Sequence, residues 1–203
     1  MRKALALAPG DAEVLDQAAS LAFVLGDFEE SVRLGNEAVE RDPVFTQLYL
    51  GLGYGYFHAG RLDEAISTFQ KAIELSPGSS GSNYYLGCVL LVNGDLDAAL
   101  AAMEKEVRDG FKFTGRALVY HALGNKAQSD VELNSLIETW TDSGAYQIAT
   151  VYAYKDEIDK AFDWLDHAIE KRDTGLSLLH GDPFIDNLRD DPRLDAVMER
   201  VSF

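Results

Sequence analysis

The chain has 203 residues, of which 47% are hydrophobic and 26% are charged, a composition that excludes wholesale disorder. Its formal net charge of −16, without any concentrated basic stretch, argues against a nucleic-acid partner and against an anionic membrane surface. Cys88 is the only cysteine, so no intrachain disulfide can form, and no apolar run approaches the roughly 20 residues of a membrane span. We therefore expect a cytoplasmic protein.

A 34-residue period organises the chain. Prolines and turn-forming glycines both recur at this interval, at Pro9, Pro43 and Pro77 and at Gly26, Gly60 and Gly94. The next glycine of the series, Gly124, follows after 30 residues, so the fourth unit is shorter. A fixed period of this length indicates stacked supersecondary units rather than one globular core.

In chain order, residues 1–9 are predicted to be the tail of a preceding helix. Five helix–turn–helix repeats then follow, over residues 12–45, 46–79, 80–109, 110–141 and 142–173. The second repeat is the clearest, since apolar periodicity predicts helices over 46–59 and 61–75 on either side of Gly60, and Pro77 prevents continuation. In the fifth repeat Asp156 replaces the turn glycine, and aspartate tolerates a left-handed backbone.

Residues 174–203 are predicted to close the array. Asp182-Pro183 and Asp191-Pro192 each place an N-capping acid before a proline at the first helical position. Apolar side chains then follow at i, i+3, i+4 and i+7, namely Leu194, Val197, Met198 and Val201. This narrow stripe predicts a C-terminal capping helix, which a stacked array needs to cover its last apolar face.

The second repeat also shows a characteristic set of large and small residues: Tyr49, Leu52-Gly53, Tyr56, Ala65, Phe69, Ala72 and Pro77. This pattern resembles the tetratricopeptide repeat family, and the resemblance covers residues 12–172. It implies an all-α, right-handed superhelical solenoid whose first helices line a concave groove. Residues 145–193 further resemble the closing segment of tetratricopeptide arrays attached to bacterial adenylate cyclases, winged-helix regulators and Ser/Thr kinases.

Family geometry assigns the groove-facing positions. In the second to fifth repeats these are Gln47, Leu50, Tyr54, Phe57, His58, Tyr84, Tyr85, Leu91, Thr114, Leu118, His121, Tyr146, Gln147 and Tyr154. Several are aromatic and none is Lys or Arg, whereas chaperone-binding members of the family hold a C-terminal carboxylate with Lys, Arg and Asn. We therefore expect an apolar or aromatic partner segment rather than an acidic C-terminal tail, with a basic residue near Glu13 and Asp16 of the first repeat. Burial in the core is the open alternative for Tyr54, Phe57, Tyr84 and Tyr85.

Three glycines stand close together in one predicted helix, at Gly51, Gly53 and Gly55. Each destabilises the helix by up to about 1 kcal/mol relative to alanine. Close helix packing explains Gly53. We predict that Gly51 and Gly55 leave room for a ligand backbone, and a loosely formed helix is the alternative.

The histidines are too scattered in the sequence to form a catalytic or metal site, and Asp163 and His167, at i and i+4, are read as a solvated helix face. No cofactor or metal is expected. We predict a non-catalytic scaffold that binds a protein or peptide in an aromatic concave groove. The alternative is a regulatory sensor module that binds a small ligand and signals to a fused cyclase, kinase or DNA-binding domain. Self-association into a homo-oligomer also remains open.

Overall fold

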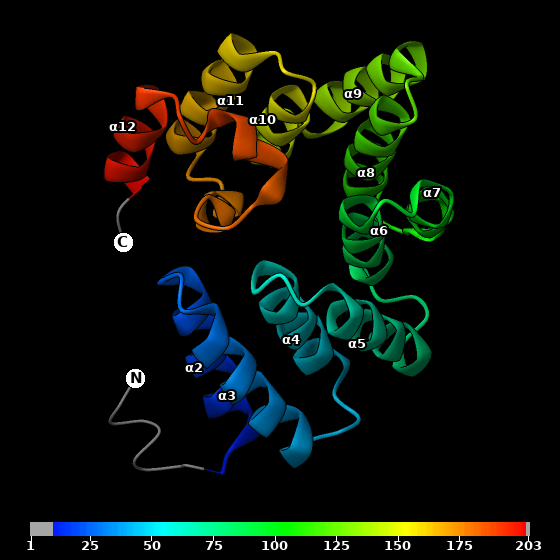
Figure 1. The fold of residues 1–203 in the computed structure, drawn as a ribbon, viewed down its shortest axis with the longest axis vertical. Coiled ribbons are helices and arrows are strands. Elements are labelled where there is room, and N and C mark those ends of the chain that lie inside the picture. The colour runs from blue at the N-terminus through cyan, green and yellow to red at the C-terminus, as the bar shows by residue number, and fades with distance from the viewer. Residues whose placement is uncertain (1–9, 202–203) are drawn as a thin grey trace. The chain divides into compact units, whose positions relative to one another are not determined.

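The computed structural model describes residues 10–201, and the regular elements of this part are all helices joined by turns and short loops, without strands (Figure 1). The predicted all-α class is confirmed, while the predicted helical tail over residues 1–9 lies outside the described range. The elements are α2 (Ala12–Val24), α3 (Phe28–Arg41), α4 (Thr46–His58), α5 (Leu62–Leu75), α6 (Ser82–Asn93), α7 (Leu96–Lys105), α8 (Asp109–Ala122), α9 (Lys126–Trp140), α10 (Ala145–Tyr154), α11 (Ile158–Lys171), the 3₁₀ segments η1 (Thr174–Leu178) and η2 (Pro183–Leu188), and α12 (Pro192–Val201).

Consecutive helices pair into hairpins: α2 with α3, α4 with α5, α8 with α9 and α10 with α11 (Figure 1). The predicted turn residues allow these reversals. Gly60 has φ +74°, a conformation that side chains disfavour because Cβ then crowds the following carbonyl. Asp156 occupies the same left-handed region at φ +63°, which confirms that aspartate takes the place of glycine in the fifth turn.

The contacts divide the described part of the chain into two compact units, the first ending at Asp95 and the second beginning at Leu96. Unit 1 contains α2 to α6, and unit 2 contains α7 to α12. The boundary falls between the two helices of the third predicted repeat, residues 80–109. The division of the chain into five repeats stays a prediction.

The core of unit 1 follows the predicted alternation of large and small residues. Phe69 of α5 is fully buried, which stabilises the fold by about 1.5–3 kcal/mol. A Cβ atom on Gly53 of α4 would lie 2.7 Å from the Phe69 ring, so glycine is what lets the ring lie against α4. Gly55 is also buried, and a Cβ there would lie 3.2 Å from Val32 of α3. Gly55 therefore serves helix packing, and the prediction that it leaves room for a ligand is wrong.

The C-terminal segment closes unit 2 as predicted. Leu194 and Val197 of α12 are buried, and Met198 and Val201 pack against the same core. That core also holds buried side chains of α10, α11, η1 and η2, among them Ala149, Leu165, Leu176 and Ile185. The carboxylate of Asp182 accepts a hydrogen bond from the Phe184 N–H at 2.9 Å, and that of Asp191 accepts one from the Arg193 N–H at 2.9 Å. Both acids thus cap their segments, although Pro183 begins a 3₁₀ segment rather than an α-helix.

Candidate functional site

The candidate site lies on the first helices of unit 1. Helix α4 contacts α2 on one side and α6 on the other, so these three helices form a continuous row. One face of α4 carries residues at i, i+4, i+7 and i+11, which are Gln47, Gly51, Tyr54 and His58. Gln47 and Gly51 are exposed, whereas Tyr54 and His58 are partly buried among other rings.

Tyr54 stands at the centre of a network of aromatic rings. Its ring centroid lies 4.4 Å from that of Tyr85 on α6, 5.8 Å from that of Phe23 on α2 and 5.4 Å from that of His58 on α4. The first two pairs meet edge to face, at 80° and 83°, and the third is stacked at 15°. Such arrangements are favoured by the ring quadrupoles. We call the four partly exposed rings, Phe23, Tyr54, His58 and Tyr85, the aromatic wall.

A second layer of rings supports the wall from inside. Phe57 and Tyr84 are 9% and 8% exposed, and their rings lie 5.2 Å from those of His58 and Tyr85 respectively. Neighbouring residues point about 100° apart around a helix, so one member of each adjacent pair faces inward. For Phe57 and Tyr84 the core alternative is therefore correct, while Tyr54 and His58 remain in part at the surface.

The wall is aromatic and contains no Lys, Arg, Asp or Glu side chain. Burial raises the pKa of Tyr54 well above its usual range, and the neighbouring Tyr85 reinforces this shift, so Tyr54 keeps its phenolic proton at every physiological pH. Phe28, at the start of α3, extends the network, since its ring lies 5.5 Å from those of both Phe23 and His58. Phe28 was not predicted, because second helices were assigned to the convex face. The short turn at Gly26 brings the start of α3 beside the end of α2.

An acidic side chain borders the wall. Asp16 of α2 is partly buried, and this burial, together with the nearby charge of Glu13, raises the pKa of the Asp16 carboxyl. A Cβ atom on Gly51 would lie 3.2 Å from Asp16 Oδ1, so this carboxylate lies over the exposed glycine of α4. That Gly51 leaves room for a ligand stays a prediction.

Several predicted groove residues are buried instead. The group comprises Leu50, Phe57, Tyr84, Leu91, Thr114, Leu118 and Tyr146, none more than 9% exposed. Thr114 and Leu118 are completely buried in unit 2, where α8 packs against α7, α9 and α10, and the Thr114 hydroxyl donates to the Gly110 carbonyl at 2.7 Å. These positions present no surface to a ligand, which corrects their assignment to the groove.

Tyr146 has an internal role that the sequence did not reveal. Its hydroxyl donates to Asp182 Oδ2 at 2.8 Å, and its backbone N–H donates to Asp173 Oδ2 at 3.0 Å. Burial raises the pKa of Tyr146 well above its usual range, and burial also raises the pKa of Asp182 to about 6. The Tyr146–Asp182 pair therefore ties the closing segment to α10.

The remaining predicted residues form a smaller patch in unit 2. The rings of His121 on α8 and Tyr154 on α10 lie 5.8 Å apart, and Tyr154 also meets Phe184 of η2 at 5.6 Å. Burial and the nearby Lys155 and Lys126 lower the pKa of His121, so its imidazole is neutral at pH 7. Gln147 of α10 is partly buried. No metal-binding group of three or more His, Cys, Asp or Glu occurs among residues 10–201.

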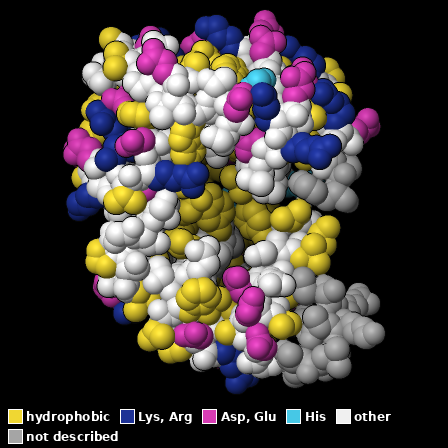
Figure 2. All heavy atoms as spheres, turned by 180° about the vertical axis from the view of Figure 1, so that it is seen from behind, with side chains coloured by type: hydrophobic (Ala, Val, Ile, Leu, Met, Phe, Trp, Pro, Cys, Tyr) yellow, Lys and Arg dark blue, Asp and Glu magenta, His cyan; other side chains and the backbone are white. Residues whose placement is uncertain are grey.

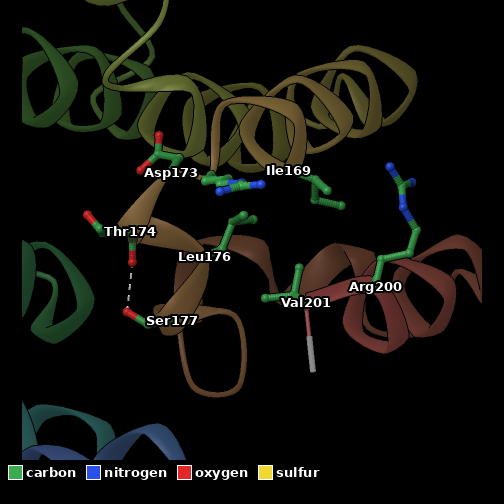
Figure 3. Close-up of a pocket in the computed structure, with 8 residues that line it drawn as sticks. Ile169, Asp173, Thr174, Leu176, Ser177, Arg200 and Val201 are labelled. Atoms are coloured by element: carbon green, nitrogen blue, oxygen red, sulfur yellow. Dashed lines mark hydrogen bonds between the residues drawn. The ribbon is translucent and has the colours of Figure 1, made fainter. Parts of the chain in front are cut away.

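Unit 2 also contains a hollow of about 430 Å³ between the end of α11, η1 and the end of α12 (Figure 3). Ile169, Leu176 and Val201 give it apolar walls, and Arg200 reaches its edge. Arg200 is paired with Asp166 at 2.5 Å. Asp173, which also lines the hollow, accepts hydrogen bonds from the backbone N–H groups of Gly175 and Tyr146.

The surface adds two observations. Lys and Arg side chains are interspersed with acidic ones on the face drawn in Figure 2, without gathering into a continuous basic patch there. Among the described helices, none combines the length and the apolar character needed to cross a bilayer.

Two models of the tetratricopeptide repeat match the chain, over residues 17–80 and 68–101. The Protein SGT1 homolog of Oryza sativa subsp. japonica is 24% identical over 180 residues, which cover 89% of this chain and 44% of that protein. Small glutamine-rich tetratricopeptide repeat-containing protein 2 of Mycosarcoma maydis is 29% identical over 77 residues, covering 38% of this chain and 22% of that protein. The chain therefore spans less than half the length of these relatives.

Solved structures show the same fold. A thermophilic TPR protein of Thermus thermophilus, TTC0263, superposes with a TM-score of 0.66 at 17% identity, covering 95% of this chain and all of that one. YrrB, described as a TPR protein with an unusual peptide-binding site, superposes with a TM-score of 0.55 at 24% identity, covering 88% of this chain and 95% of that one. The narrower resemblance of residues 145–193 to arrays fused to cyclases, regulators and kinases stays a prediction. The 34-residue period, the helical hairpins with their turn glycines and these matches together show that the chain belongs to the tetratricopeptide repeat family.

Proposed function

We propose that the chain is a non-catalytic scaffold that binds a protein or peptide segment on the aromatic wall of unit 1. The observation that carries this proposal is the row of four partly exposed rings contributed by α2, α4 and α6. Large aromatic side chains offer apolar contact area together with polar atoms, and they dominate the binding energy of many interfaces.

The packing of the wall supports this use. Each of its rings contacts at least one other, and Phe69, fully buried, lies 6.4 Å from Tyr54 and 5.8 Å from Tyr85. Side chains held in this way lose little conformational freedom when a partner binds, so more of the contact energy remains as affinity. YrrB, which shares the fold, is described as having a peptide-binding site, and this is consistent with such a role.

The charge of unit 1 supports the predicted kind of partner. Residues 10–95 contain four Lys or Arg and 13 Asp or Glu, and the wall itself contains neither. An acidic C-terminal tail would meet repulsion here and would find no guanidinium or ammonium group on the wall. The proposed partner is therefore a segment with apolar or aromatic side chains.

A peptide array probed with the wild type and with the Tyr54→Ala/Tyr85→Ala variant tests the proposal. Phe45→Ala is the matched control, because Phe45 is an aromatic residue of unit 1 that is 51% exposed and stands outside the wall. Circular dichroism first establishes that all three proteins are helical. We expect the double variant to lose the captured peptides and the control to keep them. Equal capture by all three proteins would show that the aromatic wall does not bind the peptides.

The hollow in unit 2 favours a second candidate function, the binding of a small ligand as part of a regulatory sensor. Its volume of about 430 Å³ falls within the range of small-molecule sites, and its apolar walls with a few polar groups at the edge are typical of them. A thermal-shift screen with small metabolites, read out by tryptophan fluorescence, tests this candidate. Stabilisation of the wild type that disappears in Leu176→Ala supports it. Stabilisation that persists in Leu176→Ala, or no stabilisation by any metabolite, counts against it.

A further inference from the structure

We propose that the partner segment carries an arginine or lysine side chain, which pairs with Asp16 above Gly51 next to the aromatic wall. We call this place the Asp16–Gly51 notch. The inference deepens the proposed function and rests on it, since it names the chemistry of the partner that the wall receives.

The Asp16 carboxylate is the first observation. It is partly buried, yet no hydrogen bond or ion pair reaches it from any residue between 10 and 201. Some acids of unit 1 have a partner, such as Asp11, which caps α2, and Glu30, which pairs with Arg33 at 2.6 Å, whereas others, such as Asp63, are exposed to water. Removing a carboxylate from water without a partner is unfavourable, so buried carboxylates are usually paired. A cationic side chain would complete this one.

Gly51 is the second, independent observation. It is exposed in the middle of α4, where its backbone angles do not require glycine, and alanine there would stabilise the helix by up to about 1 kcal/mol. A methyl group at this position would stand 3.2 Å from Asp16 Oδ1. The missing side chain therefore keeps the carboxylate accessible from the side of α4.

The notch is continuous with the wall. Gly51 precedes Tyr54 by three residues, so the two occupy neighbouring turns on one face of α4. An extended peptide advances by about 3.3–3.6 Å per residue. If one residue of the peptide pairs with Asp16, the residues next to it in the peptide can therefore reach Tyr54. The aliphatic stem of arginine or lysine packs well on apolar surface while its charged end stays with a carboxylate.

Charge complementarity selects the occupant. Glu13 precedes Asp16 by three residues and adds a second negative charge, and unit 1 has the excess of acids described above. A divalent cation is a poorer occupant, since no group of three or more potential ligands occurs among the described residues. The occupant that we propose for the notch is therefore a basic side chain of a peptide.

A library of random hexapeptides with capped ends, displayed on beads and probed with the labelled full chain, tests the inference. We expect captured sequences to combine apolar or aromatic residues with Arg or Lys. Asp16→Asn should abolish the enrichment in Arg and Lys while the aromatic selection remains. The matched control is Asp63→Asn on the second helix α5, which removes the same charge from an exposed position and should change nothing.

The outcomes separate the two proposals. If the wild type captures aromatic peptides without enrichment in Arg or Lys, the notch is refuted and the wall stands. If the wild type captures no peptides, both the notch and the binding function of the wall are refuted. If the enrichment persists in Asp16→Asn, or disappears equally in Asp63→Asn, the cation is bound elsewhere or by the overall charge, and the notch is again refuted.

A second experiment uses one captured peptide and its analogue in which citrulline replaces arginine. Citrulline keeps the shape of the side chain and removes its charge. We expect the wild type to bind the arginine peptide about tenfold more tightly, as for a charged hydrogen-bonded pair, and Asp16→Asn to bind both peptides equally. Gly51→Ala should lower the preference for arginine while melting no earlier than the wild type. An undiminished preference in Gly51→Ala or in Asp16→Asn contradicts the notch.

Discussion

The Asp182→Asn substitution gives a sharp test of the electrostatics of unit 2. Asp182 is 6% exposed, accepts a hydrogen bond from the Tyr146 hydroxyl and lies in the segment that closes the core. Its pKa is raised by burial from 3.8 to about 6. In the folded protein the carboxyl therefore holds its proton over a pH range in which the unfolded chain has already released it.

The sign and size of the effect follow from this shift. Because the folded state binds more protons than the unfolded state between the two pKa values, the contribution of Asp182 to stability is fully present below pH 3.8 and is lost as the pH rises through about 6. A difference of about two pKa units corresponds to about 3 kcal/mol. Asparagine has no ionisable proton, so Asp182→Asn lacks this dependence.

Tryptophan fluorescence during urea unfolding provides the assay. Trp140 and Trp164 are the two tryptophans of the chain and both belong to unit 2, so the signal reports on the unit that contains Asp182. The free energy of unfolding is measured from pH 4 to pH 8 for the wild type, Asp182→Asn and the control Asp190→Asn, whose side chain is exposed.

We expect the free energy of unfolding of Asp182→Asn, relative to that of the wild type, to increase by up to about 3 kcal/mol between pH 4 and pH 7. Asp190→Asn should show no such trend. A difference that stays flat with pH, or that decreases, would show that the hydrogen bonds from Tyr146 and Phe184 outweigh burial and would refute the reasoning.

Three further substitutions have defined outcomes. Gly53→Ala should destabilise unit 1 by about 1–3 kcal/mol, because the added methyl group presses on the Phe69 ring, and circular dichroism melting will show whether it does. Tyr56→Phe should lower stability by about 1 kcal/mol in the same assay, because Tyr56 and Asn36 exchange two hydrogen bonds in a largely buried setting, and an unchanged melt would mean that water replaces them. Arg172→Gly should stabilise unit 2 by up to about 1 kcal/mol in tryptophan-monitored urea unfolding, since Arg172 ends α11 at φ +53°, and destabilisation would indicate that its side chain compensates for the strain.

The helices and turns could be predicted from local features of the sequence. Proline and glycine spacing located the hairpins, and the left-handed backbone of Asp156 followed from what that side chain tolerates. The apolar stripe of Leu194 and Val197 likewise placed α12 against the core. The 34-residue spacing comes from comparing repeats along the chain, and the other features depend on residues within one or two turns of each other.

The candidate site was predicted only in part, because exposure depends on how neighbouring helices pack. Leu118 and Thr114 occupy first-helix positions by register, yet α8 is covered on that side and both are buried. The hydrogen bond from Tyr146 to Asp182 joins residues 36 positions apart, a separation that no local pattern reveals. Tyr54 and His58 are partly exposed on one face of α4, and their role in binding a partner stays a prediction.

Aromatic NMR spectra of the full chain, recorded while a captured peptide is titrated in, test the role of the wall most directly. We predict that the ring signals of Phe23, Tyr54, His58 and Tyr85 shift with a common binding curve, while those of Trp140 and Trp164 in unit 2 stay unchanged. Shifts confined to residues of unit 2, with the four wall rings unaffected by a peptide that binds, would contradict it.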